Sequence, residues 1–380
     1  MSMKNLLLWR IAPSIILAAA CFLGYLSRHE LPLGLFFATV VPLSKGILPP
    51  HIIGHGKMKG TPEVPDDLVP QPRLANEMFL TLHGDYQVPQ IGMGMCCRPT
   101  AYDHELVYRT TLWYLLLGGR HIDGAHLYLN NKAIGRGIQE AMRRGIKREE
   151  IFVTGKIFPT HYGYEAAMKV VKSELDDLGL DYIDLFLLHF PTNFPLLGSP
   201  CQKEGKGASD CRKETWEALS ELRKKGLIRN VGVSNFSKKH IKELEELPNV
   251  APIANNQIMF NPFVPDNVME TVDYCHSHNI TITAYSPLGG AGYKDRAIVN
   301  EQLTDLSLKL GKSTSQIMLR WAIQKGCIII PGTGNPDHMR ENLNVYEFEL
   351  SGSDMKQIDD LKYTAKGTAA MMHLDTRNLK

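Results

Sequence analysis

The stretch 151–189, "IFVTGKIFPTHYGYEAAMKVVKSELDDLGLDYIDLFLLH", decides the fold. It begins and ends with strand-like runs, at 151–156 and 183–189, and both runs are apolar without the alternation of a half-exposed strand. Between them, residues 163–179 place apolar side chains three and four positions apart and end at a glycine, as a helix does. Two strands buried on both faces and joined by a helix indicate a parallel sheet.

The same unit recurs along most of the chain. Helical segments such as 104–119, 131–145 and 214–226 separate further apolar runs. Eight strand-like runs lie at 89–94, 120–125, 151–156, 183–189, 230–235, 255–260, 281–286 and 327–333. Eight strand–helix units match the (β/α)8, or TIM, barrel in count and length. An open doubly wound sheet is the alternative, but "GMGMCC" lacks the third glycine of its GxGxxG turn.

Two features precede the first run. The segment "FLTLHGDYQVP" (79–89) alternates around a Gly-Asp turn, which predicts a β-hairpin that closes the bottom of the barrel. Residues 44–75 are rich in proline and glycine and have no sustained period, so we interpret them as a linker. The predicted fold is therefore α/β, with a (β/α)8 barrel over 76–366, an N-terminal hairpin and a C-terminal tail at 367–380.

Residues 1–43 have the composition of a targeting or membrane segment. The run 11–26, "IAPSIILAAACFLGYL", is uncharged and follows Lys4 and Arg10. It is shorter than the roughly 20 apolar residues that span a bilayer comfortably, and it suits a secretory signal or a short membrane anchor. An organelle transit peptide is the alternative. We expect membrane association through residues 11–26 and a location at a membrane or in the secretory pathway.

The overall composition points to small-molecule partners. The chain of 380 residues is 44% hydrophobic and 22% charged, which is enough apolar sequence for a sizeable core. A formal net charge of +2, with no basic run interleaved with aromatic residues, argues against nucleic-acid binding.

The seven cysteines have no CxxC spacing, so neither a zinc site nor a disulfide framework is indicated. Cys201 and Cys211 could close a small loop in an oxidising compartment, but two free thiols are favoured. Cys96 and Cys97 are adjacent, which is a poor arrangement for a bridge, and we interpret them as inert thiols.

Four chemically compatible side chains lie at consecutive strand ends, where barrels build their active sites. Asp123 and Tyr128 follow the second predicted strand, Lys156 the third and His189 the fourth. A cationic lysine stabilises a phenolate and lowers the pKa of a tyrosine from its usual value near 10. Tyr128 could then protonate a carbonyl oxygen, while Asp123 holds Lys156 and His189 orients that oxygen.

Each of these residues also has a structural explanation when taken alone. A strand-end aspartate is commonly a helix cap, a lone lysine is commonly a surface charge, and a histidine among apolar residues is commonly part of a core. Their occurrence together at successive strand ends favours catalysis. His126 and His161 also flank the mouth, and we expect them only to line it.

The proposed chemistry requires an electron source, and none of these side chains can supply a hydride. A nicotinamide cofactor is implied. Ser234, Asn235 and Gln257 offer donors and acceptors for a carboxamide, and Tyr285 offers a face on which a nicotinamide ring could stack.

Several motifs, in order, resemble the aldo-keto reductase family over residues 76–366. The segments "RHIDGAHLYLNN", "FVTGK" and "DYIDLFLLHFP" resemble those that carry the family's Asp, Tyr, Lys and His. The segments "VGVSNF", "NNQIMFNPF", "AYSPLG" and "IIIPGTGNPDHMRENL" resemble its cofactor-binding strands. The resemblance implies a monomeric or weakly associating barrel that reduces aldehydes or ketones with a nicotinamide cofactor. By the motif positions, Tyr128 would be the acid, Lys156 and Asp123 would tune it, and His189 would lie at the substrate oxygen.

By the same resemblance, the cofactor contacts fall at the ends of most of the strands. They are Gly94, Met95, Asp123, Ser234, Asn235, Gln257, Tyr285, Ser286, Leu288, Thr333, Gly334, Asn335, His338 and Asn342.

One departure concerns the 2′-phosphate of NADP. Where the family has a Lys and an Arg that bind this phosphate, the chain has Gly332 and His338. Thr333 and Asn335 keep hydrogen-bonding capacity, and Arg340 lies two residues beyond the expected Arg. NADP is the expected cofactor, and NAD is the alternative because the paired contact to the phosphate is missing.

A second hypothesis is not enzymatic. The same barrel could be a catalytically weak, cofactor-binding regulatory subunit of a membrane partner, as some relatives of the family are. The complete set of four residues favours the enzyme, since only chemistry requires all four in register. The loop 191–211, rich in Gly, Ser and Pro, is predicted to overhang the mouth, and its mixed polarity names no substrate.

Overall fold

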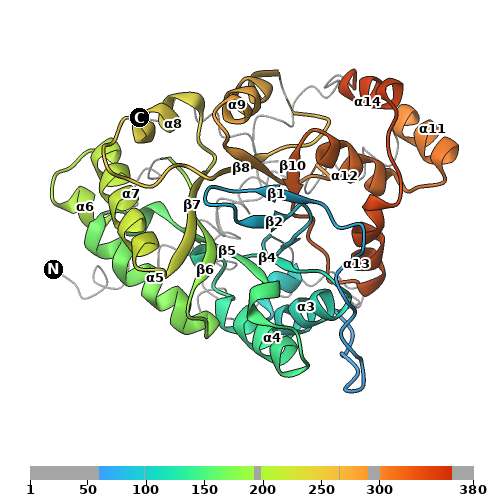
Figure 1. Cartoon of the computed structure of the whole chain (residues 1–380), viewed down its shortest axis with the longest axis horizontal. Coiled ribbons are helices and arrows are strands. Elements are labelled where there is room, and N and C mark those ends of the chain that lie inside the picture. Colours follow the sequence, from blue (N-terminus) through green and yellow to red (C-terminus); the bar gives the residue numbers. More distant parts are fainter. Residues whose placement is uncertain (1–59, 98, 192–197, 265, 290–299, 362–380) are drawn as a thin grey trace, which may run out of the picture. The chain divides into compact units, whose positions relative to one another are not determined.

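The computed structural model describes residues 60–361 except 98, 192–197, 265 and 290–299. In this part of the chain, eight strands form a parallel sheet in sequence order (Figure 1). They are β3 (Met93–Gly94), β4 (His121–Asp123), β5 (Phe152–Ile157), β6 (Ile183–Leu188), β7 (Ile228–Ser234), β8 (Asn255–Met259), β9 (Thr281–Tyr285) and β10 (Cys327–Ile329). A parallel bridge between Ile91 and Ile329 joins the first strand region to the last. The predicted (β/α)8 barrel is confirmed.

The hairpin is formed by β1 (Phe79–Thr81) and β2 (Gln87–Pro89), which pair antiparallel. Figure 1 shows it over the centre of the ring of barrel strands. It contributes two side chains to an apolar cluster with residues from the lower part of the barrel interior. The cluster consists of Leu82, Val88, Phe152, Leu185, Leu187, Ala254 and Ile328. The hairpin therefore closes the barrel bottom, as the alternating pattern predicted.

Helices alternate with the strands and cover the outside of the barrel. They are α3 (His104–Leu116), α4 (Asn131–Arg143), α5 (Tyr164–Leu178), α6 (Pro200–Lys203), α7 (Ala208–Lys224), α8 (Lys238–Glu245), α9 (Asp266–Ser277), α11 (Glu301–Leu310), α12 (Thr314–Gln324), α13 (Pro336–Leu343) and α14 (Gly352–Asp359). One-turn 3-10 helices are η2 (Pro99–Tyr102), η3 (His126–Tyr128), η4 (Arg148–Glu150), η5 (Pro159–His161) and η6 (Asn344–Tyr346). All six residues of β5 and of β6 are buried, since the helices cover one face and the barrel interior the other.

Residues 60–75 contain no helix or strand, but they pack against the barrel. The Thr61 hydroxyl is buried and lies 2.9 Å from that of Thr110 on α3. The indole nitrogen of Trp113 donates a hydrogen bond to the carbonyl of Pro62 at 3.0 Å. This part of the predicted linker is therefore held in place by α3.

The predicted membrane segment at 11–26 lies outside the described residues, as do the rest of 1–59 and the tail at 367–380. Among the residues that the structure does describe, no helix is long and apolar enough to cross a bilayer.

Two disulfide bonds correct the interpretation of four cysteines. Cys201 on α6 is bonded to Cys211 on α7, and their Cα atoms are 5.7 Å apart. This pair forms because the short helix α6 packs against the start of α7, which brings the two thiols together. Cys96 and Cys97 are bonded to each other after β3, where Cys97 has a positive φ of 64°. The predictions of free thiols at 201 and 211 and of inert thiols at 96 and 97 were wrong.

Candidate active site

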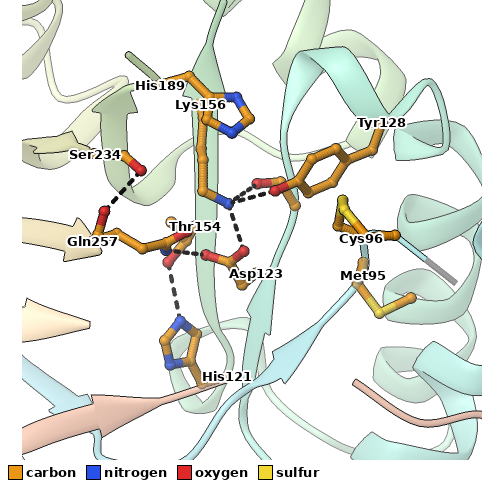
Figure 2. Close-up of polar contacts among 12 residues, drawn as sticks. Met95, Cys96, His121, Asp123, Tyr128, Thr154, Lys156, His189, Ser234 and Gln257 are labelled. Atoms are coloured by element: carbon orange, nitrogen blue, oxygen red, sulfur yellow. Dashed lines mark hydrogen bonds and ion pairs between the residues drawn. A yellow bond between two sulfur atoms is a disulfide. The ribbon is translucent and has the colours of Figure 1, made fainter. Parts of the chain in front are cut away.

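The predicted Asp, Tyr and Lys meet at the carboxyl ends of β4 and β5. Figure 2 shows the side chain of Lys156 directed toward Asp123 and Tyr128. Its ammonium nitrogen donates to Asp123 Oδ1 at 2.5 Å and to the carbonyl of Gly124 at 2.8 Å. The same nitrogen lies 3.4 Å from the phenolic oxygen of Tyr128. One buried cation therefore contacts a carboxylate and a phenol together.

Local geometry explains why these residues meet. Asp123 ends β4 and pairs in register with Thr154 of β5, two residues before Lys156. Tyr128 ends the one-turn helix η3, and Leu129 after it has a φ of 56°. The side-chain Nδ2 of Asn130 donates to the carbonyl of Met95 at 3.0 Å, which ties this turn to the end of β3.

The charges of the Lys156–Asp123 pair are compensated within the barrel. Lys156 and Asp123 are both almost fully buried. Burial lowers the pKa of Lys156, and the neighbouring Asp123 opposes this shift by favouring the cation. The second oxygen of Asp123 accepts a hydrogen bond of 2.7 Å from Nε2 of Gln257. Both carboxylate oxygens thus have donors, which a buried ion pair requires.

His189 follows β6 and lies beside Tyr128, with the two ring centroids 5.8 Å apart in an edge-to-face arrangement. Its side chain is buried, and its backbone N–H donates to the carbonyl of Ile157 at 3.0 Å. Burial, followed by the positive charge of Lys156, moves the pKa of His189 well below the ordinary histidine value. The imidazole is therefore neutral near pH 7 and retains one N–H to donate.

Four residues that were predicted to hold a carboxamide and a ring lie next to this group. Asn235 Nδ2 donates to the carbonyl of His189 at 3.0 Å, and the Tyr285 hydroxyl donates to Asn235 Oδ1 at 2.9 Å. The Ser234 hydroxyl donates to the backbone carbonyl of Gln257 at 2.9 Å. Amide and hydroxyl groups beside a partly exposed aromatic ring suit a nicotinamide, which presents a flat ring and a carboxamide.

Comparison with known proteins identifies the family. Residues 90–362 match the family model described as "Aldo/keto reductase family". The chain belongs to the aldo/keto reductase family. It is therefore an oxidoreductase of a family that acts on small carbonyl compounds with a nicotinamide cofactor.

Individual relatives agree with this assignment. The aldo/keto reductase described here is 34% identical over 286 residues to the 9,11-endoperoxide prostaglandin H2 reductase of Trypanosoma cruzi (strain CL Brener), covering 75% of this chain and 92% of that protein. It is 33% identical to aldo-keto reductase family 1 member A1 of Mus musculus, covering 78% and 93%. Among solved structures, MGS-M4, an aldo-keto reductase from a Medee basin deep-sea metagenome library, matches with a TM-score of 0.66 at 32% identity, covering 76% of this chain and 97% of that one.

The remaining predicted cofactor contacts of this aldo/keto reductase lie at the same edge of the barrel. Gly94 ends β3 and Met95 follows it, while Ser286 and Leu288 follow β9. A Cβ atom at Gly94 would lie 2.7 Å from the carbonyl oxygen of Ile330, so the close approach of these two segments requires glycine.

The turn before α13 holds the residues predicted at the 2′-phosphate. Asn335 caps α13, with its side-chain oxygen accepting from the N–H of Asp337 at 2.9 Å, and its own N–H donates to the Thr333 hydroxyl at 3.1 Å. Gly334 lies between them. Arg340 is paired with Asp337 at 2.9 Å, so this arginine already has a carboxylate partner.

Further along α13, the other two predicted contacts differ in exposure. His338 is exposed, whereas Asn342 is buried. The family's paired Lys and Arg have no replacement of equal charge at these positions, because Gly332 and His338 stand there.

The sequence interpretation missed one polar cluster, which lies beside Tyr128. His126 Nδ1 is 2.8 Å from Oε1 of Glu174, a buried carboxylate on α5. The available signal was the place of Glu174 on the buried face of that helix, between Val171 and Leu175. Among the described residues, no cluster of His, Cys, Asp and Glu could hold a metal ion.

Proposed function

We propose that this protein reduces aldehydes or ketones with NAD(P)H and that Tyr128 donates the proton. The observation that carries the proposal is the placement of the buried ammonium of Lys156 between Asp123 and the Tyr128 hydroxyl. A cation in this position stabilises the phenolate that forms when Tyr128 gives up its proton.

Each residue of the site has a separate role around a substrate carbonyl oxygen. Tyr128 and the neutral His189 donate hydrogen bonds to this oxygen, and the Tyr128 proton moves to it as negative charge develops. Lys156 then balances the charge of the phenolate, and Asp123 holds Lys156 in place. When bound, the reduced nicotinamide supplies the hydride. Ser234, Asn235, Gln257 and Tyr285 would hold it, and the same groups serve the reverse reaction.

The test is Tyr128→Phe in the full-length chain. Oxidation of NADPH and of NADH is followed with a panel of aldehydes, ketones and sugars. The variant should bind cofactor normally but lose about 10³-fold in kcat, the range for removal of a general acid. No turnover by the wild-type protein with any substrate, or full turnover by the variant, would overturn the proposal.

We further propose NADP as the preferred cofactor, with a modest preference over NAD. Contacts to the 2′-phosphate are available from Thr333, Asn335 and His338. The pairing of Arg340 with Asp337 weakens the attraction of Arg340 to that phosphate. The ratio of kcat/KM for NADPH and NADH should rise in His338→Arg, because a guanidinium binds phosphate through two donors. An unchanged ratio would argue against a phosphate at this position.

The location of the protein is also a proposal. The uncharged run 11–26 supports a membrane anchor or secretory signal, with an organelle transit peptide as the alternative. The Cys201–Cys211 disulfide favours an oxidising compartment. We expect the barrel to be a monomer. We also expect it to be protected from added protease in intact microsomes. Digestion of the barrel without detergent would contradict a lumenal location.

A further inference from the structure

The cluster of Glu174, His126 and His161 lies outside the four residues assigned to catalysis. Glu174 belongs to α5, and only 2% of its side chain is exposed. Glu174 contacts His126, which is the first residue of η3, and Tyr128 is the last residue of the same single turn. A buried carboxylate is costly unless it is paired, so a specific partner such as His126 indicates a defined arrangement.

A second element holds His126 from another side. The rings of His126 and His161 meet edge to face, with centroids 4.8 Å apart. His161 belongs to η5, and its Nδ1 lies 3.0 Å from the Thr160 hydroxyl. Burial, followed by repulsion from His126, lowers the pKa of His161 to about 4, so this ring is neutral near pH 7. The turn that carries Tyr128 is therefore held between α5 and η5.

The position of this turn matters because the Tyr128–Lys156 contact is already long. At 3.4 Å it exceeds the usual range of about 2.7–3.2 Å for an N–H···O hydrogen bond. A further displacement of η3 by a fraction of an ångström would separate the phenol from the ammonium. Misplacement of a catalytic group by about 1 Å can reduce the rate about 10²-fold.

Glu174 also acts on Lys156 through its charge. Burial and the contact with Asp123 have the largest effects on the pKa of Lys156. The negative charge of Glu174 has the next largest effect, and it raises that pKa. Around Glu174 itself, His126 faces it from η3 and Asn131 from α4, while Asp177 lies on its own helix. Burial raises the pKa of Glu174, and the hydrogen bonds from His126 and Asn131 oppose the shift.

We propose that Glu174 and His126 are positioning residues for Tyr128, with Glu174 holding η3 through His126 so that the phenol stays against Lys156. The inference rests on the proposed function, since it assigns a role within the same reaction. Neither residue touches the substrate oxygen; both act through the turn, and Glu174 in addition supports the charged form of Lys156.

The test compares variants in the full chain by kcat, KM and the pH profile of kcat. Glu174→Gln should lower kcat about tenfold at constant cofactor KM. It should also move the alkaline fall of activity to lower pH, because a negative charge near Lys156 is removed. His126→Ala should lower kcat similarly. His126→Asn should recover most of it, because its side-chain amide can occupy the place of Nδ1.

The matched control is Asp184→Asn, which neutralises another buried carboxylate, at the opposite end of the barrel. Asp184 accepts a 2.7 Å hydrogen bond from Arg148. This control should lower Tm and leave both kcat and the pH profile unchanged. If Glu174→Gln lowers Tm in the same way without moving kcat or the alkaline limb, the role is structural and the inference is overturned.

The outcomes separate this inference from the proposed function. Absence of turnover in the wild-type protein, or full activity in Tyr128→Phe, overturns both. Turnover that depends on Tyr128 but is untouched by the Glu174 and His126 variants overturns only the positioning role. If Glu174→Gln does not fold, the pair His126→Ala and His126→Asn decides by the same readouts, and equal activity in the two overturns the inference.

Discussion

Two ion pairs with buried carboxylates lie at opposite ends of the barrel. At the mouth, Lys156 contacts Asp123 at 2.5 Å. At the bottom, Arg148 contacts Asp184 at 2.7 Å. Both carboxylates are almost fully buried, so each pair must offset the desolvation of a buried carboxylate.

The bottom pair is surrounded by further hydrogen bonds and stacked groups. Asp184 also accepts from the backbone N–H of Val153 at 2.9 Å and from Arg229 at 3.4 Å. The guanidinium groups of Arg148 and Arg229 stack on the ring of Tyr182, with their carbons 3.9 and 3.6 Å from the ring centroid. Asp184 therefore has several donors, and the arginines that contact it are held by a ring, an arrangement that favours a role in stability.

The mouth pair differs in how its cation meets the neighbouring phenol. Lys156 contacts the phenol of Tyr128 as well as the carboxylate of Asp123, and neutral His189 lies beside that phenol. The comparison shows that burial and pairing alone do not indicate function. What distinguishes the mouth is that the cation lies 3.4 Å from the phenolic oxygen of Tyr128 itself, whereas the arginines at the bottom lie over the ring of Tyr182.

The largest expected effect comes from Lys156→Met. Removing the cation should lower kcat for carbonyl reduction about 10³-fold, because the Tyr128 phenolate loses its stabilising charge. Cofactor binding, measured by fluorescence titration, should change much less. A variant that keeps more than a tenth of wild-type kcat would show that the mouth pair is structural, like the bottom pair.

Arg148→Met tests the other side of the comparison. It leaves Asp184 without its main partner, so the free energy of unfolding in urea should fall by about 3 kcal/mol. The kcat of the folded fraction should be unchanged, since Arg148 is at the opposite end of the barrel from Tyr128. If Arg148→Met protein is fully folded and still loses most of its kcat, the mouth and the bottom of the barrel are coupled.

Asp123→Asn should have a smaller effect on catalysis than loss of the lysine. The amide keeps the shape of the carboxylate but removes the charge that favours the cationic form of Lys156, so kcat should fall about 10- to 100-fold. The acceptor for Gln257 Nε2 is retained if the amide oxygen faces it. Stability measured by thermal denaturation should fall less than in Arg148→Met, and the reverse order would contradict the proposed division of roles.

The pH profile of kcat gives the smallest and most selective prediction. The pKa of His189 lies well below 6.5, so this ring is neutral and should produce no change in rate between about pH 6 and pH 8. Burial lowers the pKa of Lys156, so its cation is present at low pH and is lost as the pH rises, giving an alkaline fall that begins below the ordinary lysine range. A histidine-like limb near pH 6.5 would refute the neutral state of His189.

Much of the site could be predicted because strand ends are a local property. The apolar runs locate each strand, and the next polar residue must then face the mouth, which identified Asp123, Lys156 and His189. Glu174 could not be found in this way, because its role depends on which side of α5 meets η3. For the same reason, the packing of Thr61 against Thr110 could not be predicted, because it joins an irregular segment to a helix far along the chain.

The sequence by itself determined the eight strands, the hairpin and the four residues at the mouth, because repeating apolar patterns and strand ends are set by neighbours along the chain. Only the tertiary structure decided that Gln257 binds Asp123 and that Cys201 is bonded to Cys211. It also decided that Glu174 reaches the turn of Tyr128. These contacts join surfaces that closure of the barrel and packing of its helices bring together, and no local pattern specifies which side chains will meet there.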